Sequence, residues 1–169
     1  PEEEVTDWAC RSALRHLGFG TSGEIAAYWK AIPPEAARDW CRAALSRGEI
    51  IEVEVEGADG LCRKSLAYPD ILDAPPPEPT PRLRILSPFD PALRDRKRAE
   101  FLFGFFYRIE VFVPEPKRTW GYYVFPVMEG DRRVSRIDAK AFRDAGALRV
   151  KAFWPEAGVK LTKGRRAKL

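Results

Sequence analysis

The stretch Ile51-Glu-Val-Glu-Val-Glu56, followed by the turn Gly57-Ala-Asp-Gly60, decides the fold that the sequence predicts for the first half of the chain. Isoleucine and valine alternate with glutamate along this stretch, and a strict apolar–polar alternation is typical of a half-buried β-strand. The two glycines permit a tight reversal into a second strand near residues 61–68. We therefore expect a β-hairpin over residues 51–68.

Three helices are predicted upstream of this hairpin. The first covers residues 5–17. The second begins at the capping box Thr21-Ser-Gly-Glu24, in which each of the two outer side chains accepts a hydrogen bond from the backbone amide of the other residue. Pro33-Pro34 begins the third helix, because a proline at the first helical position forfeits no hydrogen bond. Three helices followed by a hairpin is the order of a winged helix, which we predict for residues 1–72.

A proline-rich segment, Asp73-Ala-Pro-Pro-Pro-Glu-Pro-Thr-Pro81, follows and is typical of an extended, semi-rigid linker. Beyond it the sequence predicts a short strand over residues 82–86 and a helix that Asp90 caps and that runs from Pro91 to about Phe103. Four strands are then expected, over residues 106–113, 121–128, 133–140 and 147–154. Residues 82–169 are thus predicted to form a second domain. The fold class is α+β: a winged helix, then a helix and an antiparallel β-sheet.

The net charge of +4 conceals an uneven distribution. Residues 1–81 contain 8 Lys and Arg against 15 Asp and Glu, a balance of −7, whereas residues 82–169 contain 21 against 10, a balance of +11. The two balances return the net charge of the chain. A basic half joined to an acidic half indicates a polyanionic partner that meets the basic half only. A merely solvated, arginine-rich surface is the alternative.

Several classes of protein are disfavoured by what the sequence lacks. No apolar run approaches the roughly 18–20 residues of a membrane span, and no signal-peptide pattern is present. Cys10, Cys41 and Cys62 form no CxxC pair and indicate a reduced, cytoplasmic protein rather than a zinc site. The single histidine, His16, has no nucleophile nearby to activate. We expect no metal, no organic cofactor and a monomer. Since the chain begins at Pro1 and ends in a basic run, we also expect it to be a piece of a longer protein.

Three groups of residues in the second half are candidates for binding nucleic-acid phosphates. They are Arg94, Lys97 and Arg98 on the predicted helix, Lys117 and Arg118 beside Trp120 in the turn Pro114–Trp120, and Arg132, Arg133 and Arg136 on the third strand of the sheet. A proline-stiffened tip with two cations and an indole fits a DNA groove, where an aromatic ring can wedge into a base step. Each group of cations could also be an ordinary charged surface exposed to water. The turn could also be an ordinary charged hairpin tip, with Trp120 packed on the sheet.

The predicted winged helix is poorly suited to bind DNA itself. The outer face of its third helix carries both charges, and its wing carries four acidic residues, Glu52, Glu54, Glu56 and Asp59. These carboxylates would face phosphates with like charge. We therefore expect this domain to act as a scaffold.

Several segments resemble the YcaQ/AlkZ family of winged-helix DNA glycosylases. They are Arg84–Pro91, Arg94–Arg98, Phe103–Phe105, Tyr107–Glu110, Pro114–Tyr123, Gly130-Asp131, Arg136–Lys140 and Lys151–Trp154. The resemblance covers most of residues 82–163, and residues 1–72 fit the family's architecture with less distinctive sequence. It implies an enzyme built from tandem winged helices and a β-rich C-terminal part. It also implies that such an enzyme excises bulky alkylated bases and unhooks interstrand crosslinks. It also implies that a β-hairpin of that part engages DNA, for which Pro114–Trp120 is the candidate.

The catalytic motif that the resemblance implies is a glutamine, an aliphatic residue, then glutamine or aspartate. It has no counterpart here, because the chain contains no glutamine. Hydrolysis of an N-glycosidic bond needs a polar group that orients water at the sugar carbon. We interpret Asp90 as a helix cap and Asp138 as a strand residue or an ion-pair partner of neighbouring arginines. No catalytic residue is therefore assigned.

The sequence thus predicts the C-terminal part of a DNA glycosylase, which clamps double-stranded DNA and is inactive alone. Two alternatives stay open. A winged-helix transcription regulator would need a basic third helix. A protein-interaction module would use the aromatic-rich sheet as its binding surface.

Overall fold

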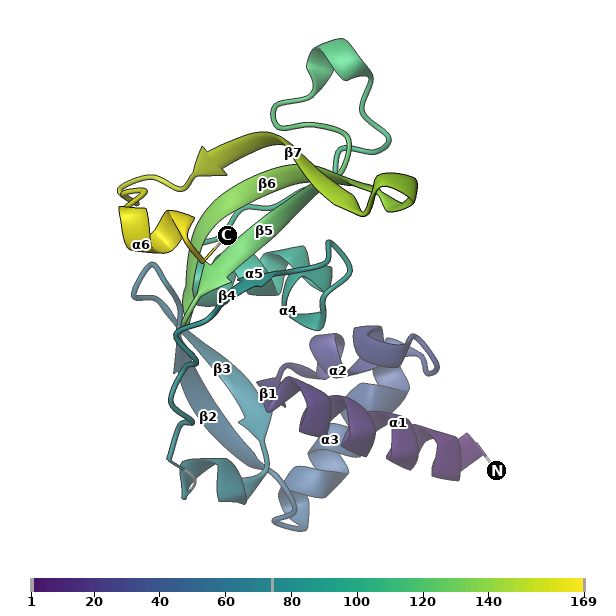
Figure 1. Ribbon diagram of the computed structural model, residues 1–169. Coiled ribbons are helices and arrows are strands. Elements are labelled where there is room, and N and C mark those ends of the chain that lie inside the picture. The colour runs from purple at the N-terminus through teal and green to yellow at the C-terminus, as the bar shows by residue number, and fades with distance from the viewer. Residues whose placement is uncertain (1, 74, 169) are drawn as a thin grey trace. The chain divides into compact units, whose positions relative to one another are not determined.

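The structure, a computed structural model, describes residues 2–73 and 75–168 (Figure 1). The chain divides into two compact units, residues 1–76 and residues 77–169. Each unit combines helices with one antiparallel sheet, so the predicted α+β class is confirmed. Within the described residues, no helix is both long and apolar enough to cross a membrane.

The first unit contains three helices and a three-stranded sheet. The helices are α1 (Glu2–Leu17), α2 (Ser22–Trp29) and α3 (Pro34–Ser46); the strands are β1 (Phe19–Gly20), β2 (Ile51–Glu56) and β3 (Cys62–Ala67), in the order β1-β3-β2, and a short helix η1 (Pro69–Leu72) follows. Residues from all three helices, among them Leu14, Ile25 and Ala44, form the core together with Ile50. The helices and the hairpin thus follow one another as predicted, and the two-residue β1 is an addition.

Local sequence signals account for these elements. The amide of Thr21 donates to Glu24 Oε2 at 2.7 Å and the amide of Glu24 donates to Thr21 Oγ1 at 3.2 Å, so the capping box is confirmed. Pro34 is the first residue of α3, also as predicted. In β2 the apolar residues are half-buried and the glutamates exposed, which confirms the alternation of residues 51–56.

The second unit contains a four-stranded antiparallel sheet in the order β4-β5-β6-β7. Its elements are β4 (Leu83–Ile85), α4 (Pro91–Arg94), α5 (Arg96–Phe103), η2 (Glu115–Lys117), β5 (Val124–Glu129), β6 (Arg132–Phe142), η3 (Arg143–Ala145), β7 (Ala147–Pro155) and α6 (Lys163–Arg166). Val127, Val134 and Ile137 form the core of the sheet, and Leu93, Phe105 and Tyr107 form a second cluster. The predicted strands over 82–86, 121–128, 133–140 and 147–154 are confirmed with shifted ends.

The prediction of one helix over residues 91–103 is wrong, because Asp95 interrupts it. Asp90 caps α4 by accepting from the amide of Ala92 at 2.9 Å, as predicted. Asp95 then adopts an extended backbone, with φ −89° and ψ 101°, and its carboxylate accepts from the amide of Arg98 at 3.0 Å. Because Asp95 ends α4 and caps α5, Arg94 does not share a helix face with Lys97 or Arg98.

The predicted strand over residues 106–113 is absent: this described segment has no strand. Side-chain packing and hydrogen bonds that involve side chains, rather than a backbone ladder, attach it to the sheet. Phe105 and Tyr107 are buried, and the Tyr107 hydroxyl donates to the carbonyl of Val124 at 2.6 Å. The guanidinium of Arg136 donates to the carbonyl of Phe106 at 2.8 Å, which takes a backbone acceptor that a strand would use. Without this strand, Pro114–Trp120 is not the turn of a β-hairpin, and that candidate is also corrected.

Candidate nucleic-acid interface

Four cations lie around Asp95 in the second unit. Arg94 is the last residue of α4, while Arg96, Lys97 and Arg98 occupy the first turn of α5. The positive end of the helix dipole lies at that turn, so each cation there is unfavourable by about 0.3–1 kcal/mol. The carboxylate of Asp95, which caps this turn, offsets part of the repulsion, and a phosphate close to the turn would offset more.

A single carboxylate closes residues 110–121, which we call the Glu110 loop. Glu110 accepts hydrogen bonds from the amides of Thr119, Trp120 and Gly121, at 2.9, 2.7 and 3.1 Å. Burial raises the pKa of Glu110, but the three donors outweigh it and hold the pKa below its usual value. The loop projects away from the sheet and carries the short helix η2 near its end (Figure 1).

The three predicted site residues of the Glu110 loop have different environments. Lys117 is exposed. Arg118 is half-buried: its Nε donates to the carbonyl of Val113 at 2.8 Å, and its guanidinium lies 5.1 Å from the centre of the Tyr122 ring. Trp120 packs edge-on against Trp154, with ring centres 5.6 Å apart, so its indole lies on the sheet rather than at a tip.

The arginines at the start of β6 also differ from one another. Arg132 is exposed, whereas Arg136 is only 6% exposed, and Arg136 Nε donates to Glu156 Oε1 at 2.7 Å. The Arg133 guanidinium lies 3.7 Å above the centre of the Phe103 ring, and its Nε and Nη2 are buried without a hydrogen-bond partner among the described residues. Burial lowers the pKa of Arg133 to about 10, so it is still charged at neutral pH.

The long hairpin of β6 and β7 forms an arm, residues 139–150, that the sequence did not mark as a site. Its strands extend to the turn at η3, and residues 143–151 are all exposed (Figure 1). Lys140 and Arg149 are paired directly across it. Both contact Phe142: the centre of its ring lies 5.4 Å from Lys140 Nζ and 4.7 Å from Arg149 Cζ. Like charges directly opposite on a sheet are destabilising by about 0.2–1 kcal/mol. The sequence did carry a signal for this arm: cations lie on both sides of the predicted turn Arg143–Gly146.

The cations of the two units are compensated differently. In the first unit four of them form ion pairs, Arg11 with Asp7, Arg42 with Asp39, Arg47 with Glu49 and Lys64 with Glu52, at 2.7–3.2 Å, and Arg15 lies over the ring of Tyr68. The second unit also has ion pairs, at Arg108, Arg136, Arg165 and Lys168. In the second unit Arg118, Arg133, Lys140 and Arg149 rest on aromatic rings and make no ion pair within residues 75–168. A cation–π contact holds a cation without neutralising it. The exposed cations among them, Lys140 and Arg149, are therefore available to a partner.

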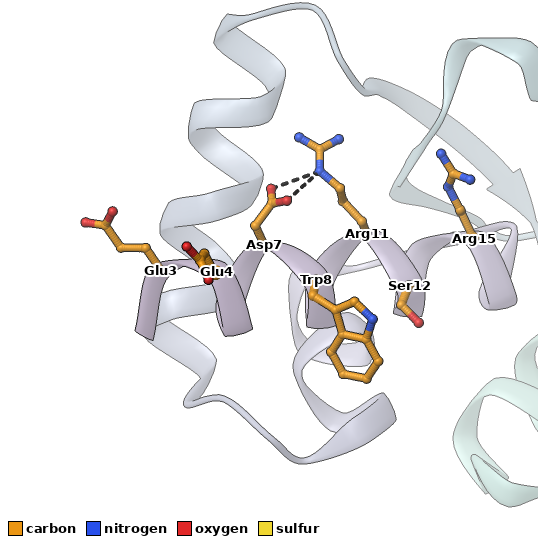
Figure 2. A pocket seen from close by; sticks show the side chains of 7 residues that line it. All are labelled: Glu3, Glu4, Asp7, Trp8, Arg11, Ser12 and Arg15. Atoms are coloured by element: carbon orange, nitrogen blue, oxygen red, sulfur yellow. Dashed lines mark hydrogen bonds and ion pairs between the residues drawn. The ribbon is translucent and has the colours of Figure 1, made fainter. Parts of the chain in front are cut away.

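Two of the hollows bear on the candidate site. One, of about 430 Å³, is lined by Arg132, Arg133, Lys160 and Arg165, but Arg165 Nε donates to Glu129 Oε2 at 2.8 Å. The other, of about 600 Å³, lies along α1 (Figure 2). There the carboxylate of Asp7 binds Arg11 and also accepts from Trp40 Nε1 at 2.8 Å. These two donors, Arg11 first, lower the pKa of Asp7, so it is an unsuitable general base. Within the described residues, no group of three His, Cys, Asp or Glu side chains could hold a metal ion.

Comparison with known proteins places the chain in a family. No solved structure matches the chain. The model of one family, described as DNA glycosylase AlkZ-like, matches residues 1–169. Since that match spans the chain, this protein belongs to the AlkZ-like DNA glycosylase family.

Proposed function

We propose that this chain holds duplex DNA for base excision through the cations of its second unit. The observation that carries the proposal is that Lys140 and Arg149, both exposed, rest on the ring of Phe142 and make no ion pair within residues 75–168. In a member of a DNA glycosylase family, such uncompensated cations fit the phosphate backbone, whose neutralisation releases counterions. Phosphate contacts position a protein on DNA without reading its sequence.

The proposed contacts come from four places. They are Arg94, Lys97 and Arg98 around Asp95, Lys117 and Arg118 on the Glu110 loop, Arg132 and Arg133 at the start of β6, and Lys140 and Arg149 on the hairpin arm. We leave out Arg136 and Trp120, because Arg136 is bound to Glu156 and Trp120 packs on Trp154. The hairpin arm replaces Pro114–Trp120 as the β-hairpin that the resemblance implies.

For the first unit we propose a winged helix over residues 1–72 that acts as a scaffold, joined by the linker 73–81 to a DNA-binding domain over 82–169. The element order α1-β1-α2-α3-β2-β3 and the pairing of β1 with β3 support this proposal. The exposed glutamates of β2 support the scaffold role, because they would repel phosphates.

We further propose that this chain alone releases no base. It has neither glutamine nor asparagine to orient an attacking water. Two of its carboxylates already bind other groups: Asp7 holds Arg11 and Trp40, and Glu110 holds three backbone amides. Incubation of the purified chain with duplexes that contain alkylated bases should therefore yield no free base, whereas measurable release would place the chemistry within this chain.

Salt titration of duplex binding tests the DNA-holding role. The double variant Lys117→Ala/Arg118→Ala should weaken binding to unrelated duplexes equally. It should also flatten the salt dependence, by about 0.9 in log–log slope for each phosphate that is no longer neutralised. A transcription regulator would instead discriminate between duplex sequences. Unchanged affinity and slope in the double variant would remove the Glu110 loop from the interface.

A further inference from the structure

Phe112 is the most solvent-exposed large apolar side chain of the described residues, at 94% exposure. It lies in the Glu110 loop, in a turn closed by a hydrogen bond from the amide of Val113 to the carbonyl of Glu110 at 3.0 Å. The rings that build the nearby core, Phe105 and Tyr107, are each 5% exposed. Phe112 therefore contributes almost nothing to the packing of its own unit.

The turn that carries Phe112 is braced on both sides. On one side, the Glu110 carboxylate accepts three backbone hydrogen bonds from residues 119–121. On the other, Arg118 Nε donates to the carbonyl of Val113, the residue after Phe112. A braced turn loses little conformational entropy when its tip is inserted elsewhere, so the ring is presented at low cost.

We propose that Phe112 inserts its ring into the base stack of the duplex that this unit holds, an inference that rests on the proposed function. An apolar side chain that enters between base pairs unstacks them and kinks the duplex, while neighbouring cations bind the flanking phosphates. Arg118 donates to the carbonyl of Val113, the residue after Phe112, and Lys117 is exposed on the same loop. The loop thus combines an apolar tip with two cations, which matches the bases and backbone of DNA.

Phe112 fits this role better than Trp120, the aromatic residue that the sequence singled out. The Trp120 ring is held by Trp154 at 5.6 Å and by Arg136 at 4.6 Å, and its withdrawal would expose packed surface. Insertion of the 94% exposed Phe112 ring would uncover no such surface. Burial of its ring between bases would also remove apolar surface from water, which favours insertion.

The experiment uses the 169-residue chain and a short duplex with the adenine analogue 2-aminopurine, whose fluorescence is quenched while it is stacked. Anisotropy measures binding, and fluorescence at saturation measures unstacking. Phe112→Ala should bind about tenfold more weakly, a change of about 1.4 kcal/mol, within the range for a base stacked on an aromatic ring. It should lose the fluorescence increase and keep the salt slope, because no charge is removed. Phe112→Trp should retain the increase.

Phe89→Ala is the matched control, since Phe89 is also a strongly exposed phenylalanine of this unit, at 70%, but lies outside the Glu110 loop. It should bind and unstack DNA like the wild type. Saturated binding without any fluorescence increase in the wild type overturns insertion alone and leaves DNA holding intact. A fluorescence increase that persists in Phe112→Ala likewise overturns the insertion of Phe112 and leaves the DNA-holding role intact. Absence of duplex binding by the wild type overturns both proposals.

Discussion

The cation pair Lys140–Arg149 on the hairpin arm gives the sharpest test of the proposed interface. The two residues oppose each other across β6 and β7 and share the ring of Phe142. Since each charge lies within 5.4 Å of the ring centre, the two charges lie within about 10 Å of each other, roughly one Debye length at 0.1 M salt. Both are exposed. We predict that replacing either by alanine affects DNA binding strongly and stability weakly.

The expected magnitudes follow from this geometry. Two like charges about 10 Å apart in water repel by about 0.4 kcal/mol before screening, and the cation–π interaction that the substitution removes is worth about 0.5–1 kcal/mol. These terms oppose each other, and their difference means that the free energy of unfolding should fall by about 0.1–0.6 kcal/mol. For binding, a cation that neutralises one phosphate contributes a slope of about 0.9, or roughly eightfold in affinity at about 0.1 M salt. The double variant should therefore bind about sixtyfold more weakly.

The assay is a set of anisotropy titrations with a labelled duplex at several salt concentrations, with thermal melts of each variant alongside. Arg42→Ala is the control, because Arg42 is an exposed cation of α3 that faces Asp39 at 3.2 Å. It should leave affinity and slope unchanged. If Lys140→Ala binds with wild-type affinity and slope while Arg42→Ala binds more weakly, the interface lies on α3 and the reasoning fails.

Two further predictions concern groups that hold the interface in place. Arg136→Ala should destabilise the second unit by about 1–3 kcal/mol, because it leaves the carboxylate of Glu156 and the carbonyl of Phe106 without their donor; a melt identical to that of the wild type would contradict this. The pKa of Glu110 is lower in the folded chain than the ordinary value of 4.5, so its stabilisation is present above that value and is lost as the pH falls through the folded pKa. The protection of the Trp120 amide against hydrogen exchange, relative to its intrinsic rate at each pH, should then fall in acid, whereas Glu110→Gln, which cannot titrate, should show no such step.

The elements that the sequence predicted well are those whose signals are local. The capping box at Thr21 and the proline at position 34 each act within one helical turn, and the alternation over residues 51–56 needs only that one face be buried. Such a pattern can be recognised from the sequence because the residues that interact are close together in it. For the same reason, Asp90 could be recognised as a cap before its partner was known.

The elements that it missed depend on distant residues. Residues 106–113 have the composition of a strand, but Arg136, thirty positions from Phe106, takes the carbonyl that a strand would have used. Asp95 was expected to lie inside one helix, whereas its carboxylate accepts from the amide of Arg98 and begins a second helix. In the site, the basic character of the second half was visible, whereas the pairing of Lys140 with Arg149 needed the register of β6 and β7. The exposure of Phe112 likewise needed the path of its loop.

The aromatic residues of the second unit have a consequence for binding beyond charge. A free lysine or arginine loses about 0.5–1.5 kcal/mol of side-chain freedom when a partner immobilises it. Arg118, Lys140 and Arg149 are already restrained by rings, so part of that loss is incurred when the chain folds. An ion pair would restrain them equally but would have to be broken before a phosphate could bind. The ring of Phe142 therefore gives this unit two cations, Lys140 and Arg149, that are ordered without an ion pair, which favours contact with a polyanion whose sequence need not be read.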